Sequence, residues 1–308
     1  MVTQTRSPTE TPFAIHPATR LGHVHLTVAE LERQLAFYQE VLGFTLHWRA
    51  GATAGLGAGE EDLLRLTEVR GAQRMRHTTG LYHFALQFSS RRELARGLAR
   101  LFELRYPNSP TDHVISKTTY LDDPEGNTIE LYIPSPEDGT YTAVNGNLDI
   151  RHADGRPSNG REPLDVAALF RELAPSDRLD EPLPAEVTMG HVHLYGADIY
   201  ASMRFYHDVL GFKVVSLVPN FRIGDVSVNG KQVHTIAFNT WMGEGAPPPP
   251  ADALGMRYFT IVLPNTTELE HVVARVQQAG GATEQTEEGV LVHDPSQSGV
   301  VLAKAPNS

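Results

Sequence analysis

The chain has 308 residues, a formal net charge of −11, 41% hydrophobic residues and 20% charged residues. This length allows two domains, each with its own core, and the acidic balance argues against nucleic-acid binding, which needs clustered lysine and arginine. No cysteine is present, which excludes disulfides, thiolate metal sites and a cysteine nucleophile. Any metal must therefore be held by nitrogen and oxygen ligands.

Residues 1–19 are expected to form an N-terminal arm. This arm lacks the apolar core of a signal peptide, and no stretch of the chain approaches 18 consecutive apolar residues. The sequence therefore predicts a cytoplasmic protein with no membrane partner. Assembly into a homo-oligomer stays open.

Residues 21–44 and 189–212 repeat each other, with twelve of 24 positions identical at a constant offset of 168. Each copy opens with an alternating strand, Gly-His-Val-His-Leu. Apolar residues three or four apart over residues 31–42 then predict an amphipathic helix. Gly43 and Gly211 fit the position just past a helix, where a positive φ is often needed. The chain is therefore a tandem duplication.

Each half continues with a second segment of the same strand–helix–strand–strand design. The sequence thus predicts an α+β fold of four βαβββ modules paired into two tandem domains. The expected second segments are a strand at 81–88, a helix at 91–101 and strands near 118–121 and 127–133, then a strand at 256–263, a helix at 268–279 and strands at 289–293 and 299–303.

The division expected from this pattern has a metal-bearing catalytic domain at residues 20–135 and a second domain at 188–308. Between them, residues 136–187 are rich in Gly, Asp and Pro. This segment is expected to be a connector, with one short helix near 164–173 that packs across a domain face.

The module, its opening Gly-His-Val-His-Leu and the closing Asp-Pro-x-Gly-Asn-x-x-Glu of residues 123–130 resemble the vicinal oxygen chelate superfamily, which includes glyoxalases, bleomycin-resistance proteins and extradiol dioxygenases. More narrowly, Gly-Leu-Tyr-His-Phe-Ala at 80–85, Asn-Thr-Trp at 239–241 and the proline run 247–250 resemble the bacterial catechol 2,3-dioxygenase branch. The resemblance covers roughly residues 20–304. It implies cleavage of a catechol-type aromatic diol by O₂ at a mononuclear non-haem metal.

The resemblance assigns the metal ligands to His23, His83 and Glu130. Two imidazoles and one carboxylate form the facial triad expected for Fe(II), with Mn(II) a close substitute. Three protein ligands leave three positions open, two for the diol oxygens and one for O₂. His23 is chosen over His25 because the family's ligand directly follows the glycine; His25 remains a candidate for a supporting contact or for the core.

The second half is expected to lack a complete metal site. It has the first histidine, His191, but Tyr258 stands where the first half has His83, and Val301 where it has Glu130. One imidazole without a carboxylate would hold iron poorly.

Three residues are candidates for proton transfer. Tyr120 lies ten residues before Glu130, the spacing of a pocket tyrosine in ring-cleaving members of the family, and His113 lies seven residues before Tyr120. The family's usual acid–base histidine would fall at Glu68, a departure, and His77 is the nearest histidine. A buried core tyrosine and a loop histidine are the alternatives for Tyr120 and His113.

Two other functions remain open at this point. A glyoxalase-like isomerase would use the same scaffold with two carboxylates and two histidines. A non-catalytic small-molecule-binding protein would lack the triad.

Overall fold

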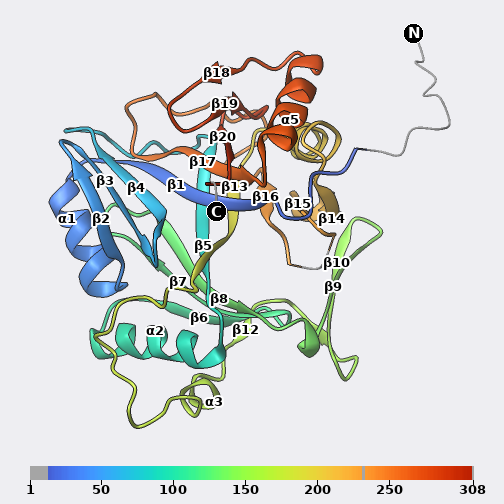
Figure 1. Ribbon diagram of the computed structural model, residues 1–308. Helices are drawn as coiled ribbons and strands as arrows, with labels where there is room; N and C mark the ends of the chain where they lie inside the picture. Colours follow the sequence, from blue (N-terminus) through green and yellow to red (C-terminus); the bar gives the residue numbers. More distant parts are fainter. Residues whose placement is uncertain (1–12, 231–232, 307–308) are drawn as a thin grey trace.

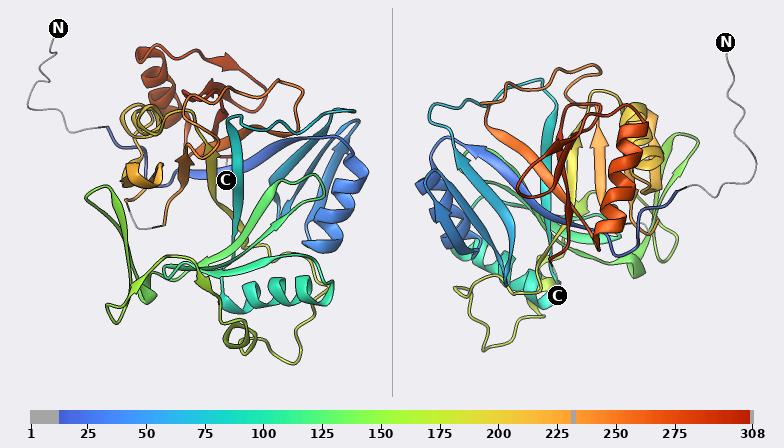
Figure 2. Two further views of the ribbon diagram at one scale, coloured as in Figure 1. Left: turned by 180° about the vertical axis from the view of Figure 1, so that it is seen from behind. Right: turned by 45° about the horizontal axis from the view of Figure 1, so that its top comes forward.

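The computed structural model describes residues 13–230 and 233–306; most of the expected N-terminal arm lies outside these residues. Two large β-sheets form the interior, and helices cover their outer faces (Figures 1 and 2). The predicted α+β class with βαβββ modules is confirmed. No helix among the described residues is long and apolar enough to cross a membrane.

The first half contains two modules in chain order. Module 1 is β1 (Arg20–Val28), α1 (Leu31–Ala36) continued by the π-helix η1 (Phe37–Val41), β2 (Thr45–Ala50), β3 (Thr53–Ala58) and β4 (Glu61–Glu68). Module 2 is β5 (Gly80–Gln87), α2 (Arg91–Glu103), β6 (Ser109–Asp112), β7 (Ser116–Asp122) and β8 (Thr128–Pro134).

The second half repeats this arrangement. Module 3 is β13 (Thr188–Tyr195), α4 (Ile199–Met203) continued by the π-helix η3 (Arg204–Val209), β14 (Lys213–Val218), the short η4 (Pro219–Phe221), β15 (Ile223–Ser227) and β16 (Ile236–Asn239). Module 4 is β17 (Gly255–Leu263), α5 (Thr266–Gln278), β18 (Glu284–Gln285), β19 (Val290–His293) and β20 (Gly299–Lys304).

The sheets combine the modules across the two halves. The eight-stranded sheet has the order β18-β19-β20-β17-β1-β4-β3-β2, so it joins module 4 to module 1. The nine-stranded sheet has the order β12-β6-β7-β8-β5-β13-β16-β15-β14, so it joins module 2 to module 3. The sequence predicts one domain from modules 1 and 2 and the other from modules 3 and 4. In the structure the sheets instead cross the two halves: β5 forms its antiparallel ladder with β13, and β1 with β17.

Contacts between helices and turns still hold the two modules of each half together. The hydroxyl of Tyr38 donates to Asp123 Oδ2 at 3.0 Å, and that of Tyr206 donates to Asp294 Oδ2 at 3.0 Å. Both tyrosines are fully buried, where a hydroxyl needs a partner. The repeated tyrosine thus fixes the first helix of each half against the Asp-Pro turn of the same half.

The connector is more ordered than the sequence analysis predicted. It contains η2 (Pro136–Asp138), a small sheet of β9 (Gly139–Val144), β10 (Asn147–His152) and β11 (Pro157–Ser158), then β12 (Glu162–Pro163) and α3 (Val166–Phe170). The β9–β10 hairpin projects from one side of the molecule in Figure 1. The expected helix is present but short, and it packs against α2.

Candidate metal centre

Three neighbouring strands bring two histidines and a glutamate together. β5 lies between β8 and β13, and Ala85 of β5 is level with Glu130 on one side and His191 on the other. Residues side by side in a sheet project from the same face, and so do residues two apart on one strand. His83 therefore shares this face with Glu130 and His191, and the small side chain of Ala85 leaves room between them.

The ligand atoms of these residues are evenly spaced. Nε2 of His83, Nε2 of His191 and Oε2 of Glu130 lie 3.1 Å apart in each of the three pairs. Three ligands on one face of an octahedron, each about 2.1 Å from a divalent ion, lie about 3.0 Å apart. Two imidazoles and one carboxylate at this spacing fit a divalent metal ion such as Fe(II) or Mn(II).

The protonation states also suit metal binding. Burial lowers the pKa of His191 to about 3, assisted by repulsion from His234, so the imidazole is neutral near pH 7. Burial alone would raise the pKa of Glu130, but His191 and His83 hold it well below its usual value. A neutral imidazole and an ionised carboxylate are the forms that bind metals. Within the described residues, this is the one group of three or more such side chains whose ligand atoms lie within 4.8 Å of one another.

His23, which was expected to be a ligand, is not part of this group; His191 lies beside His83 and Glu130 in its place. His23 lies in the other sheet, where its Nε2 is 3.2 Å from Oε2 of Glu288. Glu288 also accepts a hydrogen bond from Tyr258 at 2.8 Å and pairs with Arg65. This cluster is the counterpart, in the other sheet, of the group of His83, Glu130 and His191, and Tyr258 stands in it where that group has His83. It holds the cation of Arg65 beside a carboxylate.

The structure brings Tyr120 and His113 together beside the triad. Tyr120 is level with Glu130 in the β7–β8 ladder, and its hydroxyl is 2.9 Å from Nε2 of His113. Nδ1 of His113 contacts the carbonyl oxygen of Gly160, which can only accept a hydrogen bond. Nδ1 therefore carries the proton, and Nε2 accepts the hydrogen bond of the Tyr120 hydroxyl.

The pKa shifts of this pair support the assignment. Burial lowers the pKa of His113, so its ring is neutral near pH 7. Burial, followed by the negative charge of Glu130, raises the pKa of Tyr120 well above its usual value. Tyr120 thus keeps its proton and donates a hydrogen bond to Nε2 of His113, while its oxygen can still accept a hydrogen bond from a bound molecule.

His193 is a further histidine at the site that the sequence analysis did not select. Its Nε2 is 2.8 Å from the amide nitrogen of Asn239, whose Oδ1 accepts from the backbone N–H of Trp241 at 2.9 Å. The amide nitrogen donates, so Nε2 of His193 accepts. The Asn-Thr-Trp motif therefore fixes the orientation of this imidazole.

The triad lies in a cavity of about 190 Å³ to which the connector contributes one wall. The β9–β10 hairpin belongs to this wall, and the sequence contains a signal for it. Asn-Gly at 145–146 favours a tight two-residue turn with two positive φ angles, and φ is 51° and 76° at these residues. Arg161 lies with its guanidinium carbon 5.8 Å from the centre of the Tyr120 ring. The lining of the cavity is largely apolar; the connector contributes Tyr141, Leu148 and Ile150, and other elements contribute Ile115, Phe221, Ile223 and Trp241.

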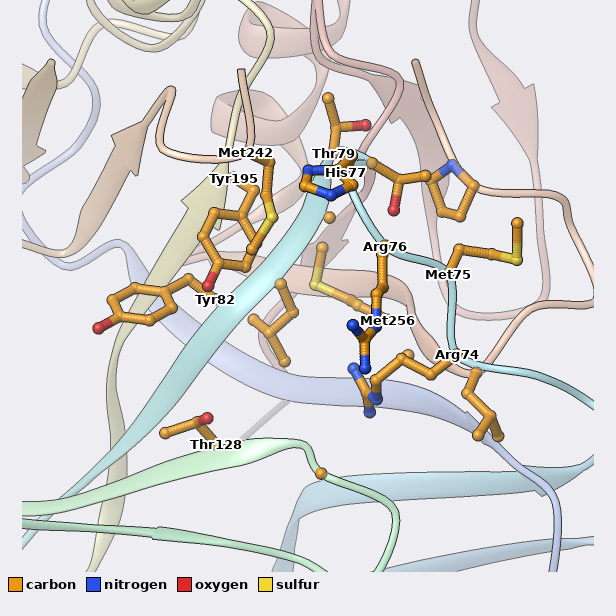
Figure 3. A pocket seen from close by; sticks show the side chains of 17 residues that line it. Arg74, Met75, Arg76, His77, Thr79, Tyr82, Thr128, Tyr195, Met242 and Met256 are labelled. Atoms are coloured by element: carbon orange, nitrogen blue, oxygen red, sulfur yellow. The ribbon is translucent and has the colours of Figure 1, made fainter. Parts of the chain in front are cut away.

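His77 does not reach the triad cavity. It lies in the loop before β5, is exposed, and has a positive φ of 58°. It lines a second cavity, drawn in Figure 3, together with Arg74 and Arg76. The structure thus does not bring His77, which was chosen for its proximity in sequence to His83, together with the triad.

Comparisons with known proteins agree with this architecture. The family described as the Glyoxalase/Bleomycin resistance protein/Dioxygenase superfamily matches residues 20–131 and 188–290. A protein of Bacillus subtilis (strain 168) named catechol-2,3-dioxygenase is 37% identical over 285 residues, which cover 92% of this chain and 96% of the relative.

Solved structures show the same fold at low sequence identity. A putative dioxygenase from Bacillus subtilis subsp. subtilis str. 168 matches with a TM-score of 0.59 and 12% identity, over 97% of this chain and 87% of the other. Glyoxalase I from Zea mays matches with a TM-score of 0.55 and 18% identity, over 93% and 92% of the two chains. With the family match in both halves and the relative that spans nearly the whole chain, the protein belongs to the glyoxalase/bleomycin resistance protein/dioxygenase superfamily.

Proposed function

We propose that this protein is an extradiol dioxygenase that opens a catechol-type aromatic diol with O₂. The observation that carries the proposal is the evenly spaced set of His83, Glu130 and His191. The relative named catechol-2,3-dioxygenase supports it. A glyoxalase-like site needs two carboxylates. The converging group found among the described residues contains a single carboxylate, that of Glu130.

His83, Glu130 and His191 would hold Fe(II), or Mn(II) in its place. When bound, the ion would supply a centre through which electrons pass between the diol and dioxygen. The chain provides the conditions for this chemistry: all three ligand side chains are buried, with 3–4% of their surface exposed. The apolar wall of the cavity accepts an aromatic ring and limits the access of water.

Tyr120 and His113 are placed to move a proton from the diol. The Tyr120 oxygen can accept a hydrogen bond from a substrate hydroxyl while its own O–H donates to Nε2 of His113. A proton that leaves the diol can therefore pass to Tyr120 as the Tyr120 proton passes to His113. Burial lowers the pKa of His113, and the charge of Glu130 and the carbonyl of Gly160 partly oppose that shift.

The function is tested by loading the protein with Fe(II) under anaerobic conditions and then adding catechol and air. We expect a yellow ring-fission product and the uptake of one O₂ per catechol opened. Glu130→Ala should abolish both, because it removes the carboxylate from the centre. A loaded protein that consumes no oxygen with a panel of catechols, but isomerises the adduct of methylglyoxal and glutathione, would establish the glyoxalase-like alternative instead.

A narrower prediction concerns the hydroxyl of Tyr120. Tyr120→Phe keeps the ring and should keep the metal content, but it breaks the link between the substrate and His113. Proton transfer by a positioned side chain contributes roughly a hundredfold or more to rates, and each tenfold corresponds to about 1.4 kcal/mol. We expect kcat for catechol to fall on the order of ten- to a hundredfold, measured by oxygen uptake in the iron-replete variant.

The matched control is His113→Gln, which keeps a polar partner for Tyr120 but cannot carry the proton. It should lower kcat by a comparable factor, and the double variant should be little worse than either single variant, because both residues act in one relay. Unchanged kcat in Tyr120→Phe would leave Tyr120 a core residue of the β7 strand.

A further inference from the structure

A second cavity, of about 420 Å³, lies at the start of β5 and is built by loops from both halves of the chain (Figure 3). The loop before β5 and the loop before β17 are hydrogen-bonded to each other. The backbone N–H of Thr79 donates to the carbonyl oxygen of Pro247 at 3.0 Å, and the backbone N–H of Leu254 donates to the carbonyl oxygen of Gln73 at 3.1 Å. The two loops between modules therefore meet at this cavity, and the side chains of Arg74 and Arg76 remain exposed to solvent at its edge.

Two arginines supply positive charge to this cavity. Figure 3 shows the guanidinium groups of Arg74 and Arg76 directed toward the same part of it. Arg74 donates to the carbonyl oxygen of Glu125 at 2.9 Å and to Oδ1 of Asn127 at 2.8 Å, and both acceptors are neutral. Neither guanidinium forms an ion pair with the described residues. The carboxylate of Glu125 is itself bound by the backbone N–H groups of Ala29 and Glu30.

The rest of the cavity is largely apolar. Thioether, aliphatic and aromatic side chains line it, contributed by Met75, Leu81, Tyr82, Tyr195, Met242 and Met256. An apolar pocket with a few convergent charges is the usual form of a small-molecule site. A guanidinium pair matches a carboxylate in shape and charge. The complementary ligand is therefore a small, partly apolar carboxylate.

Tyr82 connects this cavity to the triad. Among the described residues it alone lines both cavities. His83 pairs with His193, and Leu81 with Leu194, so Tyr82 is an extra residue bulged out of the β5 ladder. Its ring centre lies 4.9 Å from that of His83 and 5.0 Å from that of Tyr195. The side chain of Tyr82 thus borders both the triad cavity and the cavity that holds the two arginines.

We propose that this second cavity binds the ring-opened product on its way out of the enzyme, an inference that rests on the proposed function. Extradiol cleavage breaks the ring C–C bond beside the diol. One atom of O₂ ends in a carboxylic acid and the other in an aldehyde, and no further oxidant is needed. The acid then loses a proton to water near pH 7. Catechol has no carboxylate, so Arg74 and Arg76 distinguish product from substrate.

The test is calorimetric titration of the full-length, Fe(II)-loaded protein, kept anaerobic, with cis,cis-muconate as a stable ring-opened carboxylate. We expect binding that Arg76→Gln weakens on the order of tenfold, because a hydrogen-bonded charge contact is lost. Arg70→Gln is the matched control: Arg70 is an exposed arginine of the same loop that lines neither cavity. It should leave muconate affinity within about twofold.

Glu130→Ala distinguishes the two cavities. It should remove the metal but leave muconate affinity nearly unchanged, because Glu130 does not line the second cavity. Absence of muconate binding, or binding that depends on Glu130 and not on Arg76, would overturn the proposal. If Arg76-dependent binding is found but the loaded protein opens no catechol, the proposed function fails. The cavity then binds carboxylates, but the ring-opened product is not its ligand.

Discussion

His191→Ala is expected to remove most of the bound metal, as Glu130→Ala does, whereas His23→Ala should leave it in place. The reason is geometric: Nε2 of His191 is 3.1 Å from the ligand atoms of both His83 and Glu130. His23 instead contacts Glu288 in the other sheet. Even supporting contacts of a metal site cost ten- to a hundredfold in affinity, so loss of a direct ligand should cost at least about a hundredfold.

The measurement is elemental analysis of the three variants after dialysis, with turnover of catechol alongside. His23→Ala is a matched control because it removes the same side chain from the equivalent strand of the other half. Its expected effect is on stability, since Glu288 loses one of the partners that hold its pKa at about 2 against the effect of burial. Full metal in His191→Ala and depletion in His23→Ala would restore the ligand set expected from the first half alone.

The sequence was sufficient for the strand that opens each module and for the two long helices, but not for the strands of the connector. Alternation of apolar residues located β1, β5, β13 and β17, and the helices at 91–101 and 268–279 correspond to Arg91–Glu103 and Thr266–Gln278. Their starts follow from side-chain caps, because Ser90 and Asn265 each accept a hydrogen bond from the backbone N–H three residues later. His83 and Glu130, assigned from the family motif, do lie together.

The third member of the proposed ligand set could not be selected from the sequence, because both copies offer the same Gly-His-Val-His strand. Which copy completes the site depends on which strand pairs with β5. That pairing joins strands far apart in the sequence, so local sequence patterns do not reveal it. The structure places β13 beside β5, so His191 lies with His83 and Glu130 of the first half. The same exchange puts His23 beside Tyr258, so each site combines residues from both halves of the chain.

Gly190→Ala is expected to disturb the metal centre through packing alone. A Cβ atom at position 190 would lie 2.2 Å from the hydroxyl oxygen of Tyr132 and 2.6 Å from its ring. Tyr132 cannot easily move, because it is 1% exposed and its hydroxyl donates to Gln87 at 3.0 Å. The strand must shift instead, and it carries His191 at the next position. Overpacking of this kind costs roughly 1–3 kcal/mol.

We expect Gly190→Ala to lower the midpoint of thermal unfolding and to weaken metal binding roughly ten- to a hundredfold, the range for loss of a supporting contact. Gly22→Ala is the matched control at the same position of the other copy, where the new Cβ would meet Val262 at 3.0 Å. It should also lower stability, since that contact is tight, but the affinity for metal should not change because β1 supplies no ligand. Metal titrations of the two variants show whether Gly190 positions His191 or serves only the fold of the strand. If Gly190→Ala binds metal as tightly as Gly22→Ala, the glycine before His191 is needed for the fold of the strand and has no part in positioning the ligand.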